Sequence, residues 1–387
     1  MKFLKKIFKG FVIFLVVLNL AIWFSGNTHI YKGLTDTYFQ GRLKPTIDDP
    51  DIFYNRVLHA KNTKSWKESP LMNSKPLSEQ VNESNKVFGT KAFLVIKGDE
   101  IIHESYYDGY SKDKISNSFS MAKSILSVIT GIAVKEKRLS IEESVQSYLP
   151  DFVQEKDKDL KIKHLLSMTS GMNFKESYGN PIGFMAKAYY GTDLKELTKG
   201  YELEKEPGSE YSYLGGNNLL LGFVLEKVTE EKVSDYGSRM LWEKLGMEND
   251  AKWILDHENG DEKTFTGIYA TARDFAKIGK LYMNYGNMYG EQIVDSSYVI
   301  QSISPVNVPD VAGENTDYYG YSWWLTTYKG SKVFYMRGIL GQYVICVPDK
   351  DLIITRLGQL RSKEKTKDNN APDDLWSYLE EGFRLIE

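Results

Sequence analysis

The sequence is poor in residues that form disulfides or hold metal ions. Its 387 residues include one cysteine, Cys346, and five histidines that are scattered and form no HExxH motif. One thiol excludes an internal disulfide and a cysteine-ligated zinc or iron–sulfur site. We therefore expect no cofactor and no metal, although a site made of carboxylates stays formally open. Cys346 lies in the apolar run YVICV and is expected to be a core residue.

An excess of charge of one sign is also lacking. The chain carries 49 basic and 52 acidic residues, a net charge of -3, so there is no electrostatic case for a nucleic-acid partner. Hydrophobic residues at 42% and charged residues at 26% exclude wholesale disorder. Aromatic residues are abundant, with 26 Tyr and 7 Trp. They favour a sizeable cleft of the kind that binds a small molecule.

The first 26 residues combine lysines with an apolar run. Four lysines up to Lys9 precede the stretch from Gly10 to Phe24, which only Asn19 interrupts. Fifteen helical residues span about 22 Å, less than the roughly 30 Å of a bilayer core, but the residues before Gly10 can lengthen the stretch. No A-x-A-like cleavage site follows, so we expect an uncleaved membrane anchor (1–26) with the remaining chain outside the cytoplasmic membrane. A cleaved signal peptide and a hydrophobic helix of a soluble protein are the alternatives.

The rest of the chain divides into a polar segment and a larger domain. Residues 27–85 are turn-rich and are expected to form an extended arm that packs on the main domain, with little regular structure. Residues 86–387 begin with a β-hairpin pattern at 92–107, continue with helical patterns over about 120–250, and end with strand patterns between 320 and 357 and a helix near 373–386. This order predicts one sheet assembled from both ends and an inserted helical region, in the α/β (α+β) class.

The segment SFSMAKSILSVITGIAV places Ser120 and Lys123 three residues apart. Residues at this spacing share one face of a helix. The apolar residues that follow predict a buried helix, and burial disfavours the ammonium form of a lysine. A neutral amine beside a hydroxyl is a general base for a serine nucleophile, so the pattern points to nucleophilic catalysis. The spacing alone is weak, and a snorkelling lysine at a helix N-terminus is the alternative.

Two further Ser-x-x-Lys matches show how unspecific the spacing is. They begin at Ser111 and Ser362, and both lie in charged stretches that are expected to be solvated. A solvated lysine stays protonated and cannot act as a base near neutral pH. We therefore expect only the match at Ser120 to have a catalytic role.

Four segments in matching order resemble the class C β-lactamase-related serine hydrolase superfamily. They begin SFSMAKS, IKHLLSMTSGM, PGSEYSYLGGNN and GQYVICVPDKD, and the similarity covers about residues 85–387. The S-M-A-K-S form, with PTIDDPDIF in the arm, most resembles the 6-aminohexanoate-dimer hydrolase-like branch. The resemblance implies the serine β-lactamase/DD-peptidase-like fold, an antiparallel sheet covered by helices, with the site in the cleft beside the helical region and no cofactor.

The resemblance implies catalytic roles for three residues. Ser120 is the implied nucleophile and Lys123 its base. The family's second motif, a tyrosine two residues before Asn or Ser, falls on Tyr213, which is implied to pass a proton to the leaving group. The last position of that motif is Gly215 here, so a side-chain hydrogen bond is missing, and Asn217 is the candidate replacement donor.

We also expect particular roles for four other residues in or near the cleft. Tyr178 lies where the dimer-hydrolase branch has a substrate-contacting loop tyrosine, although it could equally be an ordinary loop aromatic. His164, in IKHLLSMTSG, is expected to stabilise a structural turn and not to react. Trp323 and Trp324 are neighbours on an expected strand, so their side chains face opposite sides and at most one lines the cleft.

The family's third motif, Lys-Thr-Gly or His-x-Gly, falls on Met336-Arg337-Gly338. Gly338 fits an edge strand that a substrate approaches closely, and the N–H groups of Ser120 and Ile339 are implied to form an oxyanion hole. Strand alternation puts Met336 and Arg337 on opposite faces. Arg337 then either points to solvent or replaces the missing cation. If Met336 faces the cleft, substrates with a carboxylate are expected to be poor.

Together these features predict a serine hydrolase that cleaves an amide or ester bond of a small molecule through an acyl-enzyme on Ser120. Two alternatives stay open. One is a β-lactamase or D-Ala-type peptidase acting at the cell wall. The other is a catalytically decayed, membrane-anchored binding or sensor protein, because Gly215 and Met336 depart from the family pattern. The oligomeric state is unknown.

Overall fold

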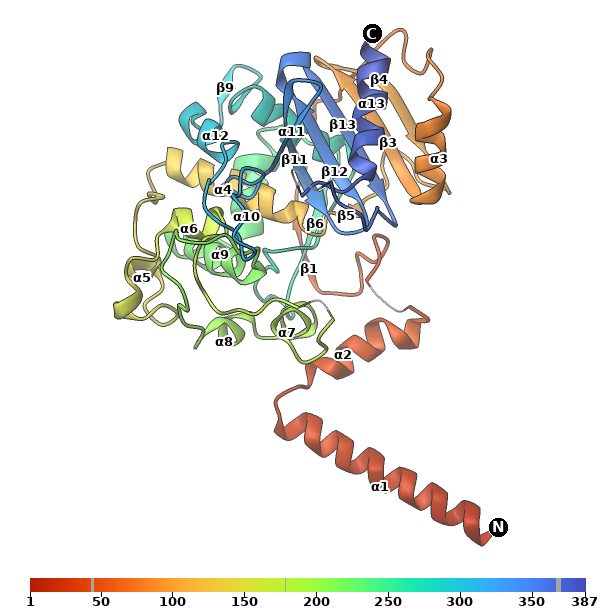
Figure 1. Cartoon of the computed structure of the whole chain (residues 1–387), viewed down its shortest axis with the longest axis vertical. Helices are drawn as coiled ribbons and strands as arrows, with labels where there is room; N and C mark the ends of the chain where they lie inside the picture. Colours follow the sequence, from red (N-terminus) through yellow and green to blue (C-terminus); the bar gives the residue numbers. More distant parts are fainter. Residues whose placement is uncertain (43–44, 178, 367–369) are drawn as a thin grey trace.

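A seven-stranded sheet is the centre of the molecule (Figure 1). The computed structural model describes residues 1–42, 45–177, 179–366 and 370–387. Neighbouring strands of the sheet are antiparallel except β2 and β4, which pair in parallel. The sheet is therefore assembled from both ends of the domain, as expected. In sheet order the strands are β10 (Trp324–Tyr328), β11 (Ser331–Gly338), β12 (Gln342–Val347), β13 (Leu352–Gly358), β3 (Thr90–Lys97), β4 (Glu100–Tyr106) and β2 (Lys67–Glu68).

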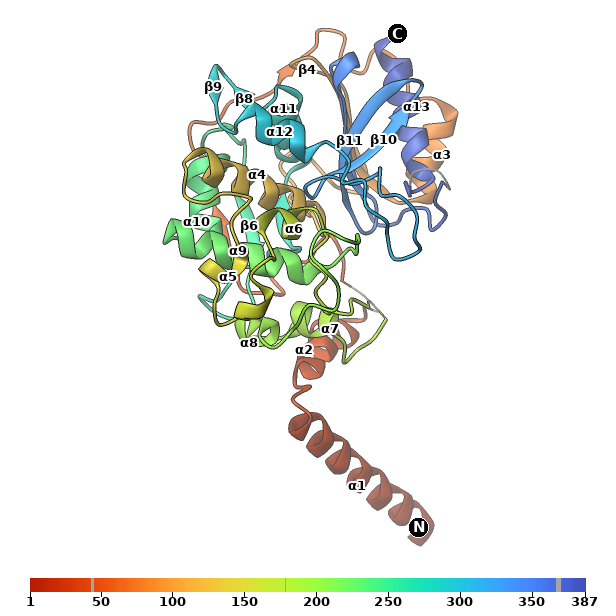
Figure 2. The ribbon, with the colours of Figure 1, turned by 60° about the vertical axis from the view of Figure 1, so that its left-hand side comes forward.

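Helices cover both faces of this sheet because its strands are buried on both sides. Along β11, Phe334 and Met336 belong to the core cluster that includes α4 (Met121–Lys135) and α11 (Ala272–Met283). Val333 and Tyr335 belong to the cluster on the other face, with α3 (Glu79–Val87) and α13 (Asp374–Ile386). Figure 2 shows α13 and α3 on one side of the sheet and α11 and α12 (Ser296–Ser302) on the other.

The helical region between β5 and β6 lies to one side of the sheet (Figure 1). After α4 it contains α5 (Val145–Tyr148), α6 (Ile162–Leu166), α7 (Phe184–Tyr190), α8 (Leu194–Thr198), α9 (Gly215–Thr229) and α10 (Val233–Gly237). These bounds agree with the helical patterns expected over about 120–250. The short hairpin β8 (Asn287–Met288) and β9 (Glu291–Gln292) follows α11.

A second, four-stranded sheet was not expected from the sequence. Its order is β1 (Asn55–Leu58), β6 (Ala251–Ile254), β7 (Ile268–Ala270) and β5 (Ser116–Asn117). Strands of two to four residues are too short for an alternating pattern to be recognised. The sheet matters for function because β5 ends three residues before Ser120 and so fixes the start of α4.

The segment 27–85 contains more regular structure than expected. It includes α2 (His29–Asp36), β1, β2 and most of α3, so the expectation of an extended arm with little regular structure is wrong for these residues. Before it, α1 (Lys2–Phe24) extends away from the rest of the molecule (Figure 1). At 23 residues it is about 34 Å long, and its apolar side chains are exposed. By length and composition it could cross a membrane.

Candidate active site

Ser120 lies at the N-terminal end of α4, after a strained turn. The preceding residue, Phe119, has a φ of 44°, a left-handed conformation that a bulky residue rarely adopts. Asn117 stabilises this turn, because its Oδ1 accepts the Phe119 N–H at 2.8 Å and its Nδ2 donates to the Tyr269 hydroxyl at 3.0 Å. The Ser120 side chain is thereby presented to the pockets described below.

Lys123 is buried one helical turn from Ser120. Its side chain is 1% exposed, and its Nζ lies 3.2 Å from Ser120 Oγ and 2.8 Å from the backbone oxygen of Phe265. In the described part of the chain, no carboxylate forms an ion pair with this amine. A charged ammonium without such a partner is costly to bury. The arrangement therefore suits an amine that gives and takes a proton.

Tyr213 completes a cluster around this amine. The centre of its ring lies 5.0 Å from Lys123 Nζ, and the ring packs beside Trp324, with the two centroids 5.6 Å apart. Tyr211, the neighbouring tyrosine, is 5% exposed and packs against Tyr318 at 5.7 Å. Burial raises the pKa of Tyr211 well above its ordinary value. Tyr213 is thus the tyrosine that contacts the Ser120–Lys123 pair, and Tyr211 packs beside it.

The end of β11 touches the turn that carries Ser120. A Cβ atom on Gly338 would lie 2.3 Å from the backbone oxygen of Ser118, so only glycine fits at this position. Ile339 follows and borders the same pockets as Ser120. Within the described residues, neither the Ser120 N–H nor the Ile339 N–H donates to another protein group. Two free donors beside a hydroxyl can bind a developing oxyanion.

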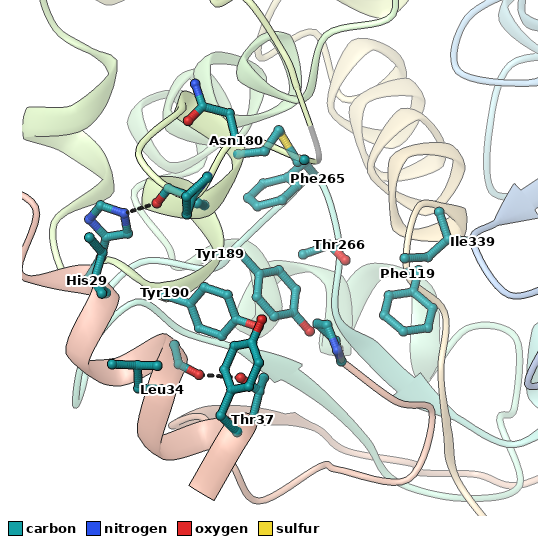
Figure 3. A pocket seen from close by; sticks show the side chains of 18 of the residues that line it. His29, Leu34, Thr37, Phe119, Asn180, Tyr189, Tyr190, Phe265, Thr266 and Ile339 are labelled. Carbon is teal, nitrogen blue, oxygen red and sulfur yellow. Dashed lines mark hydrogen bonds between the residues drawn. The ribbon is translucent and has the colours of Figure 1, made fainter. Parts of the chain in front are cut away.

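Two pockets meet at Ser120 and Ile339. We call the first, of about 470 Å³, the apolar pocket. Figure 3 shows its wall, with Leu34 on α2, Thr37 directly after that helix, and Tyr189 and Tyr190 on α7. We call the second, of about 310 Å³, the cationic pocket, because three basic side chains border it. Its lining includes Tyr213, Trp324, Arg337, Gly338, Arg361 and Lys365.

The position of Arg337 corrects one expectation about the third motif. Met336 is fully buried in the core on the α4 and α11 face of the sheet, so the condition on which poor carboxylate substrates were expected, that Met336 faces the cleft, is not met. Arg337 is 8% exposed, its guanidinium carbon lies 3.2 Å from the centre of the Trp324 ring, and its Nη1 donates to the Asn370 backbone oxygen at 2.9 Å. Alternation predicted correctly that the two residues oppose each other. It could not predict which face would be covered by helices.

Arg361 and Lys365 were missed by the sequence analysis. The segment after β13 returns to the end of β11 and brings both side chains to the cationic pocket. Lys365 belongs to the Ser-x-x-Lys match that was expected to be solvated, and the residue is indeed exposed. Partial burial of its amine, together with the charges of Arg337 and Arg361, lowers its pKa. No local sequence signal marks these residues, because only the folded chain brings them near Ser120.

Around the second motif, Glu176 occupies the space that a larger residue would need at Gly215. The Gly215 N–H donates to Glu176 Oε2, and a Cβ on Gly215 would lie 3.4 Å from that oxygen. Asn217 is fully buried, its Nδ2 lies 3.5 Å from the sulfur of Met168, and it borders neither pocket. The structure therefore does not bring Asn217 to Lys123. Tyr178 lies outside the described residues.

Three other residues have the structural positions expected for them. His164 accepts the Lys161 N–H on its Nδ1 at 3.2 Å at the start of α6, and burial lowers its pKa to about 4. Trp323 stacks on Tyr282 in the core, with centroids 4.4 Å apart, so Trp324 alone of the pair borders the cationic pocket. Cys346 is buried, and burial raises the pKa of its thiol.

In residues 1–42, 45–177, 179–366 and 370–387, no group of three or more His, Cys, Asp or Glu side chains could hold a metal ion. The arrangement around Ser120 offers a hydroxyl, an amine and a phenol.

The chain is similar to known proteins in sequence and in fold. The family model described as Beta-lactamase matches residues 81–375. The 6-aminohexanoate-dimer hydrolase of Paenarthrobacter ureafaciens is 25% identical over 284 residues, which cover 69% of this chain and 72% of that protein. A Bacillus anthracis structure, provisionally named as a 6-aminohexanoate-dimer hydrolase, superposes with a TM-score of 0.73 at 19% identity, over 86% of this chain and 90% of that one. A family VIII carboxylesterase has a TM-score of 0.62 at 16% identity, over 83% and 99%.

Proposed function

The chain belongs to the Beta-lactamase family, and on that premise we propose that it is a serine hydrolase that cleaves an amide or ester bond through an acyl-enzyme on Ser120. The named relatives support the class: one is a dimer hydrolase and one a carboxylesterase. The observation that carries the proposal is the 3.2 Å approach of the buried Lys123 amine to Ser120 Oγ. A buried amine at this distance can accept the hydroxyl proton.

The proposed reaction has two halves. In the first, Ser120 Oγ attacks the substrate carbonyl while Lys123 Nζ takes its proton, and the N–H groups of Ser120 and Ile339 hold the oxyanion. The C–O or C–N bond then breaks, and Tyr213 passes the proton to the leaving alcohol or amine. In the second half, water gives a proton to Lys123 and attacks the acyl-enzyme. The bond between Ser120 Oγ and the acyl carbon then breaks, Lys123 returns the proton to Ser120 Oγ, and the acid is released.

Hydrolysis by the full-length protein in detergent tests the proposal. The substrates are p-nitrophenyl esters, short amides, D-amino-acid peptides and β-lactams, each measured beside Ser120→Ala. We expect turnover of at least one class by the wild type and its loss in the variant. Equal rates for the two proteins would contradict Ser120 as the nucleophile. Absence of any turnover would favour the alternative of a decayed binding or sensor protein.

A second candidate, a β-lactamase or D-Ala-type peptidase, is favoured by the cationic pocket. Three basic side chains border the side of the site that Tyr213 also borders. Since Tyr213 is the proposed proton donor to the leaving group, this pocket would receive the leaving group. A carboxylate there would gain charge-assisted hydrogen bonds, and Arg337 would supply the cation that the third motif lacks.

A comparison of charged and neutral substrates separates the two candidates. Losing one charge-assisted hydrogen bond costs about 1.5–3 kcal/mol, or roughly 10- to 150-fold in affinity. If carboxylates bind here, Arg337→Ala lowers kcat/KM for benzylpenicillin relative to a neutral ester by about that factor. An unchanged ratio would argue against a carboxylate contact at Arg337.

We place the active site outside the cytoplasmic membrane. The lysines at the start of α1 favour the cytoplasmic side, which puts the chain after Phe24 on the other side. The helix is long enough and apolar enough to span the bilayer, and its side chains contact no other part of the described chain closely enough to be buried. The substrate would then be a small molecule of the cell exterior.

A further inference from the structure

The described residues that line the apolar pocket carry no charged side chains, apart from one histidine. Among the described residues that line it there is no Asp, Glu, Lys or Arg. Its one imidazole, His29, has its pKa lowered by burial, and His29 Nε2 lies 2.8 Å from the Pro181 backbone oxygen. A cavity of about 470 Å³ lined in this way suits a hydrocarbon group and disfavours an ion.

Helix α2 forms one wall of this pocket (Figure 3). Ile30, Gly33 and Leu34 lie at the three- and four-residue spacing of one helical face and border the cavity, as does Thr37, the residue that follows the helix. The opposite face carries Thr35, which is exposed. Gly33 lies against the Tyr190 ring of α7, since a Cβ there would be 3.5 Å from it. The wall is thus fixed to α7 by contacts on the pocket side.

This wall comes from outside the part of the chain that the family model matches. The match begins at residue 81, whereas α2 ends at Asp36. The helix follows α1 after only four residues, Ser25–Thr28, which can span at most about 14 Å. Tyr31 on α2 also donates to Asn19 Oδ1 on α1 at 2.8 Å. The pocket wall is therefore continuous with the proposed membrane anchor.

The two pockets divide the substrate at Ser120. Tyr213, the proposed proton donor to the leaving group, borders the cationic pocket and not the apolar one. The acyl half of the substrate is then the half that faces α2. We propose that the substrates are esters or amides of extended aliphatic acids, whose hydrocarbon chain lies in the apolar pocket, and that α2 determines the accepted chain length. This proposal rests on the proposed function of Ser120.

A chain-length series tests the assignment. The full-length protein is reconstituted in phosphatidylcholine vesicles, and kcat/KM is measured for p-nitrophenyl esters from acetate to decanoate. Burying one methylene is worth up to about fourfold in kcat/KM, from about 0.8 kcal/mol per CH₂. We expect kcat/KM to rise by up to that factor per methylene until the chain fills the cavity.

Two variants fill the pocket and one serves as the matched control. Leu34→Trp on α2 and Ala186→Phe on α7 both narrow the cavity, so each should move the optimum to shorter chains. Thr35→Trp adds the same indole one position away, on the exposed face, and controls for effects on folding and vesicle partition. We expect its profile to follow the wild type. Each protein is first titrated with a small fluorophosphonate, so that rates are expressed per reactive serine.

The outcomes distinguish failure of the acyl-chain assignment from failure of the proposed function of Ser120. A profile that does not rise from acetate to octanoate in the wild type overturns it, as do identical profiles for Leu34→Trp and Thr35→Trp. If the fluorophosphonate labels the protein fully and the profile is flat, only the acyl-chain assignment fails. If wild-type Ser120 is not labelled at all, the proposed function fails and the assignment with it.

Discussion

Lys123 is the residue on which the proposed chemistry depends most. Lys123→Arg keeps the positive charge, but a guanidinium cannot act as a base near neutral pH. General-base catalysis contributes about 100- to 10,000-fold, so we expect kcat/KM for a small ester to fall by a factor in that range. The measurement is steady-state hydrolysis, with circular dichroism to verify folding. Turnover close to that of the wild type would exclude Lys123 as the base.

His164 predicts an acid limit to stability. In the folded protein its pKa is lowered from 6.5 to about 4 by burial, and its Nδ1 accepts a hydrogen bond that a protonated ring cannot accept. Between these two pH values the unfolded chain therefore binds more protons than the folded protein does. The free energy of unfolding consequently rises with pH across this window. The stabilising contribution is complete above pH 6.5 and is lost as the pH falls towards 4.

The variant that checks this assignment is His164→Gln. A glutamine three residues after the N-cap can accept the same backbone N–H and does not titrate. We expect wild type to lose stability relative to this variant when denaturant unfolding is repeated from pH 6.5 down to 4. Parallel pH profiles for the two proteins would show that His164 protonation is not coupled to unfolding.

At the residue scale, the sequence predicted contacts between residues that are close together along the chain. Ser120 and Lys123 are neighbours on one helix, so their spacing alone predicted their contact. Arg361, Lys365 and Glu176 lie on segments that reach the site only through the tertiary fold, and no nearby residue indicates their position. The two faces of β11 were predicted, but which of Met336 and Arg337 meets the pocket depends on where α4 packs.

At the scale of elements, the contact between β11 and the Ser120 turn is the tightest in the site. A Cβ on Gly338 would lie 2.3 Å from Ser118 O, and one on Gly382 in α13 would lie 2.3 Å from Ile354 Cδ1. At Gly338 the close atom is a backbone oxygen, so Gly338→Ala forces a local shift at a cost of about 1–3 kcal/mol in unfolding free energy. At Gly382 it is the end of the Ile354 side chain, which can move aside. Only Gly338→Ala moves the turn that carries the nucleophile.

We therefore expect Gly338→Ala to lower both thermal stability and kcat for small esters, and Gly382→Ala to keep kcat. The rates are normalised to the fraction of folded protein at each temperature. If both variants reduce kcat equally, the loss reflects general destabilisation and not the position of Ser120.

Long helices and strands with a clear apolar pattern could be predicted from the sequence, whereas short or polar ones could not. The four strands β10–β13 and the hairpin β3–β4 have runs of apolar residues long enough to be recognised. Helices α2 and α3 are polar, with only a few buried residues each, so local pattern did not distinguish them from a loop. Contacts with segments that are distant in the sequence, such as those of α2 with α7, stabilise helices that helix propensity alone would not maintain.

At the scale of the whole molecule, we propose that α1 holds the protein at a membrane and that the domain after it carries out the reaction. We expect the full chain to remain with membranes after washing in alkaline carbonate. Ile13→Lys combined with Val17→Lys, two exposed positions of α1, should release it, because each charge at the centre of a bilayer costs about 2.5–3.5 kcal/mol. A wild-type protein that is washed off, or whose mature N-terminus lies after residue 21, would contradict the anchor.

Mass spectrometry of the labelled protein shows whether Ser120 is a nucleophile activated by its surroundings. The full-length protein is incubated with a small fluorophosphonate beside Ser120→Ala and Lys123→Arg, and the adduct is located by peptide mapping. The account predicts a single adduct on Ser120, absent from Ser120→Ala and formed much more slowly in Lys123→Arg. Labelling of another residue, or equal labelling of wild type and Ser120→Ala, would contradict it.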